Sequence, residues 1–162
     1  YLDYMKNDLQ AGEFVEAIEV PPPTHTALRA YNLSKRFDCD ISALAAGLAL
    51  TLDCDTVRDV RLVFGGMAAI VKRAKGAETA VVGQPWTEAT VEAAMQALDG
   101  DFTPLSDMRA SANYRLTVAG NLLRRFLLET TNPGVETRVA SSVRPMRKMI
   151  DSVPALMTFV RQ

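Results

Sequence analysis

A concentrated group of charged residues lies between two segments that favour β-structure, and it constrains the fold more than any other feature of the chain. The group contains two basic and two acidic side chains: Lys35, Arg36, Asp38 and Asp40. An alternating segment precedes it and a long apolar run follows it. Charge in this position is typical of a loop held between two strands, and not of a solvated tail. We refer to residues 33–40 as the charged loop.

The first half of the chain predicts strands. Residues 13–20 alternate imperfectly, are rich in Val and Ile, and stop at three prolines, which favours a strand. Residues 27–33 form a second extended segment. Residues 41–52 are apolar throughout, so that length alone would also permit a buried helix. The polar residues 53–56 and the mixed apolar run 57–66 instead favour an antiparallel pair joined by a short turn.

From residue 72 onward the apolar residues take a helical spacing. They predict one helix from 72 to about 83, a second from 87 to 100 with Thr87 as its cap, and a third from about 111 to 130. On the third helix the pattern directs three charged side chains to solvent: Arg124, Arg125 and Glu129. Strands followed by helices predict an α+β fold, a small antiparallel sheet of about three strands packed against a three-helix bundle.

The composition suits one soluble domain with its own core, because 48% of the 162 residues are hydrophobic. A net charge of −1 offers no electrostatic footprint for nucleic acid. No apolar run reaches the roughly 18 residues that a membrane span needs, and we expect a cytoplasmic protein. Two cysteines, Cys39 and Cys54, and one histidine, His25, make a metal or iron–sulfur site from this chain alone unexpected.

Three separate segments carry a family resemblance: residues 34–41 (SKRFDCDI), 63–68 (VFGGMA) and 106–115 (SDMRASANYR). Their order and spacing resemble the C-terminal part of the flavin-binding subunit or domain of xanthine dehydrogenases and related molybdenum hydroxylases. The resemblance covers residues 4–129. It implies that residues 1–23 are the end of an FAD-binding domain or a leading strand, that residues 24–131 form the C-terminal domain, and that residues 132–162 are a tail without a counterpart, either flexible or a docking segment.

In that family the charged loop lies beside the flavin ring. Lys35 and Arg36 are then the expected donors, with Asp38 and Asp40 holding the loop in shape, and the positive charge can stabilise negative charge on the ring. The full set implied to bind the cofactor is Val15, Asn32, Leu33, Lys35, Arg36, Asp38 and Asp40. Without the resemblance, the same loop would be an ordinary turn with surface ion pairs, each worth at most about 1 kcal/mol.

Two of these residues have a second interpretation or depart from the family. Asn32 stands where some relatives carry a lysine that contacts the flavin, so the charge is lost there while hydrogen-bonding capacity remains. Val15 falls where the family uses an apolar strand residue against the flavin, and it would serve equally well as sheet core. No residue is expected to be catalytic in this chain.

The chain lacks the glycine-rich motifs that hold phosphates, GxGxxG and GxxxxGK[ST]. Gly65 and Gly66 are more typical of a bend or a close approach of backbones. In the family the flavin pyrophosphate is held by loops upstream of this segment. The resemblance therefore implies that this chain supplies only part of an FAD pocket and binds FAD weakly or not at all by itself.

The resemblance also implies a larger assembly. Purine hydroxylation would occur on a molybdenum cofactor in a large subunit, and electrons would pass through 2Fe–2S clusters to FAD and then to NAD. This chain would bind none of these groups alone, and its partners would be the upstream FAD-binding and iron–sulfur portions and the molybdenum-binding subunit, in an oligomer. The alternative is a non-catalytic interaction module that joins the subunits of a larger oxidoreductase.

Four other residues favour structural roles. Asp107 and Arg109 precede the third helix, where capping and an ion pair are the expected functions. His25 follows three prolines and is expected to be exposed to solvent. Trp86 is expected to fill the gap between two helices.

Overall fold

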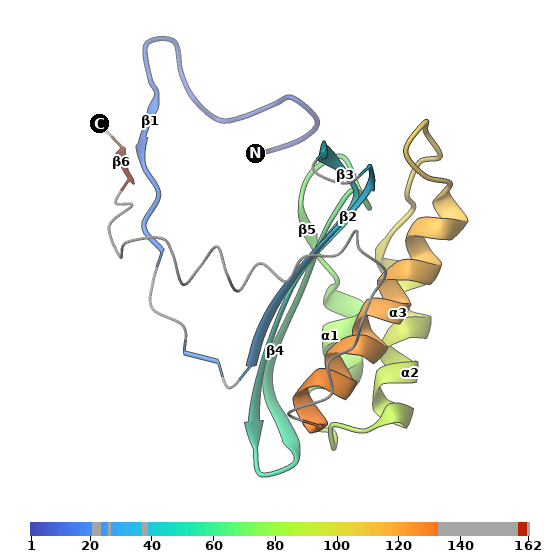
Figure 1. Ribbon diagram of the computed structural model, residues 1–162. Coiled ribbons are helices and arrows are strands. Elements are labelled where there is room, and N and C mark those ends of the chain that lie inside the picture. Colours follow the sequence, from blue (N-terminus) through green and yellow to red (C-terminus); the bar gives the residue numbers. More distant parts are fainter. Residues whose placement is uncertain (21–23, 26, 37–38, 133–158, 162) are drawn as a thin grey trace.

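The computed structural model describes residues 1–20, 24–25, 27–36, 39–132 and 159–161 (Figure 1). Its main body is a four-stranded antiparallel sheet in the order β2-β3-β4-β5, with three helices packed on one face. The predicted α+β architecture is confirmed, with one more strand than expected. The strands are β2 (Ala27–Arg36), β3 (Cys39–Asp53), β4 (Thr56–Gly65) and β5 (Lys72–Arg73), and the helices are α1 (Lys75–Val81), α2 (Glu88–Asp101) and α3 (Ala112–Thr131).

The strand expected over residues 13–20 is shorter than predicted and lies outside the main sheet. It is β1 (Val15–Ala17), which pairs with β6 (Phe159–Arg161) in a separate two-stranded sheet. Figure 1 shows this pair apart from the helices and from β2–β5. Alternation of side chains identified the extended backbone, but it carried no information about which strand would be the partner.

The apolar run 41–52 is a strand, as predicted, and not a buried helix. Its residues alternate between the two faces of the sheet. Leu44, Leu48 and Leu50 point to the helices and are fully buried. The opposite face carries small residues such as Ala45 and Gly47, so that both faces of β3 are apolar and the run looks continuous in the sequence.

A β-bulge explains why the apolar pattern of β4 is mixed. Thr51 pairs with Asp59, whereas Leu52 pairs with Val57, so Arg58 is an extra residue on β4. Val57 and Val60 are therefore both buried although they are three positions apart. A strict alternation of two could not place both side chains on the helix-facing side.

Helix α2 begins where capping chemistry predicts, whereas α1 begins at Lys75, later than the predicted residue 72, because Lys72 and Arg73 form β5. Thr87 accepts a hydrogen bond from the Thr90 amide at the start of α2, which confirms the predicted cap. Trp86 is buried against Phe126 of α3, edge to face, and its indole N–H donates to Thr130 Oγ1 at 2.9 Å. The tryptophan is thus buried, as predicted, and its contacts are with α3.

One prediction about α3 is wrong. Arg125 and Glu129 were expected to face solvent, but their side chains are each only 13% exposed. Glu129 accepts from Arg125 Nε at 2.6 Å, from Arg29 Nε at 2.9 Å and from the Tyr31 hydroxyl at 3.0 Å. Burial raises the pKa of Tyr31, and the carboxylate of Glu129 raises it further. The cause is tertiary, because β2 passes over the C-terminal half of α3 and covers these polar groups.

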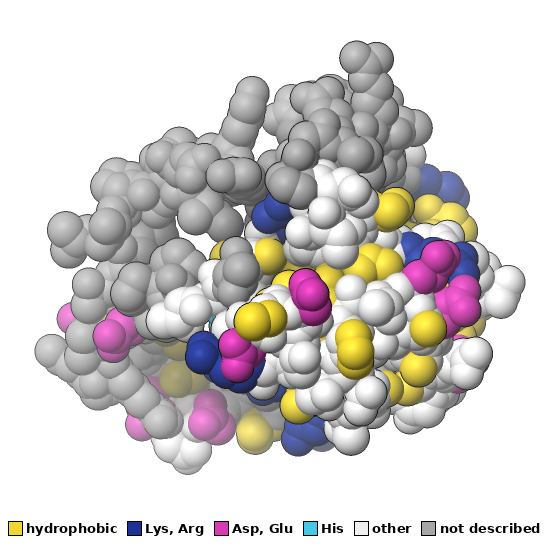
Figure 2. Space-filling model, turned by 90° about the horizontal axis from the view of Figure 1, so that it is seen from below, with side chains coloured by type: hydrophobic (Ala, Val, Ile, Leu, Met, Phe, Trp, Pro, Cys, Tyr) yellow, Lys and Arg dark blue, Asp and Glu magenta, His cyan; other side chains and the backbone are white. Residues whose placement is uncertain are grey.

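The surface at the β3–β4 hairpin end has no single sign of charge. Figure 2 views this end, and in the described part of that face Lys and Arg side chains lie next to Asp and Glu side chains. Arg124 of α3 is exposed as predicted, and it donates to Glu92 of α2 at 2.7 Å. Among the described helices, none combines the length and the apolar character that crossing a membrane requires.

Candidate functional site

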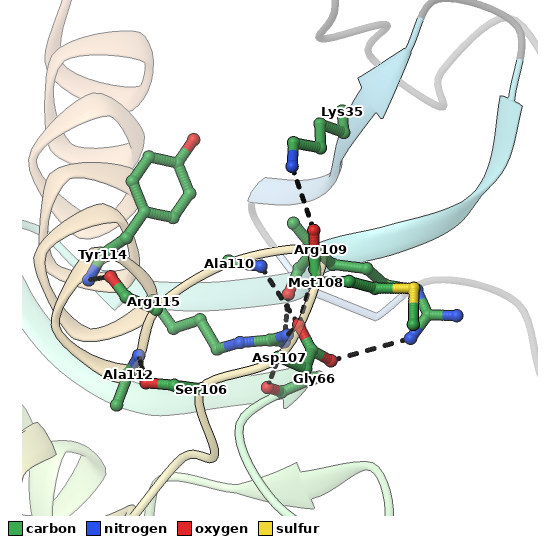
Figure 3. Close-up of polar contacts among 12 residues, drawn as sticks. Lys35, Gly66, Ser106, Asp107, Met108, Arg109, Ala110, Ala112, Tyr114 and Arg115 are labelled. Atoms are coloured by element: carbon green, nitrogen blue, oxygen red, sulfur yellow. Dashed lines mark hydrogen bonds and ion pairs between the residues drawn. The ribbon is translucent and has the colours of Figure 1, made fainter.

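Three segments that lie far apart in the sequence meet at one end of the sheet (Figure 3). The first is the end of β2, which carries Lys35. The second is the turn after β4, which contains Gly66. The third is the loop 103–111 that leads into α3. They are the same three segments that carried the family resemblance, and the contacts between them define the candidate site.

Arg115, in the first turn of α3, connects the turn after β4 and the loop 103–111 with each other and with β3. Its side chain is 4% exposed. Nη1 donates to the backbone oxygens of Ala43 and Gly66, the latter at 2.7 Å, and Nη2 donates to Asp107 Oδ1 at 2.7 Å. Sequence reasoning missed this residue. The available signal was its place on the apolar stripe of α3, four residues before the buried Ala119, where an unpaired charge would be costly.

Gly66 confirms the interpretation of the Gly65–Gly66 pair as a close approach of backbones. Its φ is +80°, a value that favours glycine. A Cβ at this position would lie 2.7 Å from the Ala43 oxygen and 2.9 Å from Arg115 Nη1. Glycine is therefore required for β3, β4 and α3 to meet around the guanidinium.

Asp107 organises the loop before α3. Its Oδ1 accepts from the amides of Arg109 at 2.8 Å and Ala110 at 3.0 Å, as well as from Arg115. Arg109 Nη1 lies 3.6 Å from Oδ2, which confirms the expected ion pair. The capping role is different from the prediction, because Ser111 caps α3 while Asp107 closes the turn that precedes it. The Ala110 and Arg109 amides, followed by Arg115, lower the pKa of Asp107 to about 2.

This lowered pKa leads to a prediction for stability at acidic pH. The pKa in the folded state lies below the ordinary value of 3.8, so the ionised carboxylate stabilises the fold above about pH 4, and the stabilisation is lost as the pH falls through about 2. We expect Asp107→Asn to be less stable than wild type at pH 6 and to lose less further stability between pH 4 and pH 2. Urea midpoints across this range measure it.

Asp99→Asn, which changes an exposed carboxyl group on α2, is the matched control and should keep the wild-type dependence. If Asp107→Asn also keeps the wild-type dependence of stability on pH, the two amide hydrogen bonds do not favour the charged form of Asp107.

Lys35 lies near the end of β2, opposite the loop 103–111. Figure 3 shows its side chain pointing to Met108 of that loop. Its Nζ donates to the Met108 oxygen at 2.9 Å. Beside this contact is an open cleft of about 360 Å³. The cleft is lined by Leu33, Ser34, Lys35, Ala43, Arg109, Ala110, Ser111 and Tyr114.

The cleft contains two of the seven residues implied to bind a cofactor, Leu33 and Lys35. Asn32 is adjacent in sequence, but its side-chain oxygen accepts from Ser42 and does not line the cleft. Val15 lies on β1, where it is 57% exposed. The structure therefore does not bring Val15 into the sheet core that was its second interpretation.

The remaining three residues belong to the tip of the charged loop. Arg36 ends β2 and Asp40 lies near the start of β3, and the strands pair as far as Arg36 and Cys39. Strands β2 and β3 thus extend further into the charged loop than predicted. Their register shifts after Leu33, and the two strands then remain paired up to Arg36 and Cys39. The side chains of Arg36 and Asp40, and all of Asp38, lie outside the described part of the chain.

The chemistry of the cleft suits one edge of a planar, partly apolar ring that takes up negative charge. Lys35 and Arg109 supply cationic groups, while Leu33, Ala43 and Ala110 supply apolar surface. This donor set fits the edge of a flavin ring.

His25 is less exposed than predicted, with 13% of its side chain accessible. Its Nδ1 lies 3.1 Å from Thr51 Oγ1 and 3.6 Å from Asp59 Oδ2. Both partners meet the same ring nitrogen, which is not the arrangement of a catalytic triad, where the two nitrogens have separate partners. Within the described ranges, no group of three or more His, Cys, Asp and Glu side chains could hold a metal ion.

Comparisons with known proteins identify the family of this chain. Residues 29–130 match the model of the CO dehydrogenase flavoprotein C-terminal domain family. A xanthine dehydrogenase of Emericella nidulans is 34% identical over 128 residues, which are 76% of this chain and 9% of that protein. The xanthine dehydrogenase FAD-binding subunit of Escherichia coli O157:H7 is 27% identical over 126 residues, 76% of this chain and 43% of that subunit.

Solved structures give the same result. The reconstituted CO dehydrogenase of Oligotropha carboxidovorans superposes with a TM-score of 0.56 at 29% identity, over 65% of this chain and 36% of that chain. The chain thus spans less than half the length of these relatives. The matched residues contain the whole four-stranded sheet except the first residues of β2, together with nearly all of the three helices. The chain belongs to the CO dehydrogenase flavoprotein C-terminal domain family.

Proposed function

We propose that this chain is part of the FAD-containing electron-transfer subunit of a xanthine dehydrogenase-like molybdenum hydroxylase. In this role it shapes the part of the flavin pocket from which electrons pass to NAD. The names of the relatives support the proposal, since they include xanthine dehydrogenases and an FAD-binding subunit. FAD, when bound, would supply the redox chemistry. The upstream FAD-binding and 2Fe–2S portions and the molybdenum-binding subunit would be its partners.

The observation that carries this proposal is the fixed position of Lys35 at the edge of the cleft. Its ammonium group is held by the Met108 carbonyl at 2.9 Å, and Arg109 also lines the cleft. A cation that is already in place stabilises charge that develops beside it better than one that must first be ordered. Lys35 and Arg109 would therefore favour negative charge on a ring in this cleft, while Leu33 and Ala43 would offer apolar surface to the ring.

The proposal predicts a selective defect when the charge of the loop is removed. In the complete enzyme, Lys35→Ala with Arg36→Ala should slow electron transfer to NAD and leave reduction of the molybdenum centre by substrate near wild type. Loss of these two charges should cost about 1–2 kcal/mol, roughly a 5- to 30-fold shift in the equilibrium between oxidised and reduced flavin. Single-turnover measurements of the two half-reactions and a redox titration of the flavin test this.

The matched control is Lys75→Ala with Arg58→Ala, which removes one lysine and one arginine from exposed positions away from the charged loop. It should behave as wild type in both half-reactions. An equal loss of both half-reactions in the loop variant would identify the loop as an assembly element, in agreement with an interaction module. No change in either half-reaction would mean that the charged loop is a solvated turn without a role at the flavin.

A further inference from the structure

We propose that Arg115 is a positioning residue that sets the place of the Lys35 ammonium group, although the two side chains do not touch. It would act through Asp107 and through the carbonyl of Met108. The inference rests on the proposed function for its consequence at the flavin, but the coupling between Arg115 and Lys35 can be measured without it.

The first step is that Arg115 is itself held rigidly. The Ala43 and Gly66 oxygens accept from Nη1, and Asp107 accepts from Nη2. The three acceptors come from the first half of β3, the turn after β4 and the loop before α3. A planar guanidinium can reach acceptors in different directions with separate N–H groups, whereas a lysine offers a single charged nitrogen. The arrangement is therefore specific for arginine.

The second step is that the fixed position of Asp107 sets the orientation of the Met108 carbonyl. Asp107 Oδ1, fixed by Arg115, accepts the Arg109 amide at 2.8 Å. That amide belongs to the same planar peptide unit as the Met108 carbonyl, and in a trans peptide the N–H and C=O point in opposite directions. Fixing the N–H on Asp107 therefore turns the Met108 oxygen away from Asp107, towards β2.

The third step is the contact with Lys35. The Met108 oxygen accepts from Lys35 Nζ at 2.9 Å. Lys35 is exposed, so without this acceptor its flexible stem would spread the charge over many rotamers. Figure 3 shows the complete series of contacts, from Gly66 through Arg115, Asp107 and Met108 to Lys35. A buried residue thereby controls where an exposed cation stands at the edge of the cleft.

A double-mutant cycle in the complete flavoprotein tests the coupling at the flavin. Arg115→Lys should shift the equilibrium towards oxidised flavin by about threefold, which is about 14 mV for a two-electron couple. In a Lys35→Met background the same substitution should cause no further shift. The inference is overturned if Arg115→Lys causes an equal shift in both backgrounds. It is also overturned if Lys35→Met alone shifts the flavin equilibrium but Arg115→Lys alone does not. Asp107→Ala provides the same comparison if Arg115→Lys does not fold, because Asp107 is only partly buried.

A second readout does not depend on FAD. Acetylation of Lys35 by an amine-reactive reagent, measured by peptide mass spectrometry relative to the exposed Lys75, should rise about threefold in Arg115→Lys and in Asp107→Ala, because Nζ loses a hydrogen bond. An unchanged ratio in both variants would contradict the inference. If the ratio rises but Lys35→Met leaves the flavin potential unchanged, Arg115 positions Lys35 as inferred and it is the proposed function that fails.

Discussion

Phe64→Ala should destabilise this chain by about 4 kcal/mol, within the range for phenylalanine deletions in closely packed cores. Phe64 lies on β4, is fully buried, and packs edge to face against Phe102 with the ring centroids 5.7 Å apart. Phe102 follows α2 and Phe64 precedes the Gly65–Gly66 turn, so the cavity would open between the sheet and the helix layer. Urea unfolding of the 162-residue chain measures the change.

Phe14→Ala is the matched control, because it removes the same atoms from a side chain that is 63% exposed. We expect it to change the free energy of unfolding by no more than about 0.5 kcal/mol. Equal effects of the two substitutions would mean that the sheet and the helices do not form one cooperative core.

The main sheet and the helices could be predicted because local chemistry and tertiary structure agree there. The turn at residues 53–56 pairs Asp53 directly with Thr56, and the polar residues between the two runs were enough to indicate it. Thr87 and the apolar stripes of α2 and α3 similarly marked the helices. In each case the signal lies within a few residues of the element that it predicts.

The polar groups of the interior could not be predicted, because their partners are remote in sequence. Glu129 is buried by contacts with Arg29 and Tyr31, about a hundred residues earlier. Arg115 meets backbone oxygens of Ala43 and Gly66, which carry no side-chain signal at all. Helical periodicity can place Arg115 on the buried face of α3, but it does not show which groups accept its hydrogen bonds, and it wrongly assigned Glu129 to solvent.

The candidate site was predicted in part. The resemblance selected the three segments that the fold brings together, and Lys35 and Leu33 line the resulting cleft. The separation of Val15 from the main sheet was not visible in the sequence, because a short alternating segment does not specify its partner strand. The loop variants test the proposal that the flavin lies at this cleft.

Gly66→Ala should destabilise the chain by about 3 kcal/mol, and the loss should be specific to this glycine. A φ of +80° costs an alanine about 1–2 kcal/mol. Its Cβ would also lie 2.7 Å from the Ala43 oxygen and 2.9 Å from Arg115 Nη1. Moving either group weakens hydrogen bonds of a buried guanidinium, for which about 1–3 kcal/mol is typical.

The neighbouring glycine is a stringent control for this prediction. At Gly65 a Cβ would meet Ala45 and Val71 at 3.6 Å and 3.7 Å, which is ordinary van der Waals contact. Gly65→Ala should therefore be neutral, or stabilise by about 0.5 kcal/mol through the lower entropy of the unfolded chain. Urea midpoints for the two single variants should thus move by very different amounts, although the substitutions are chemically identical and adjacent. If both destabilise equally, the cost reflects loss of flexibility in the turn after β4, and the close approach of Gly66 to Ala43 and Arg115 is not its cause.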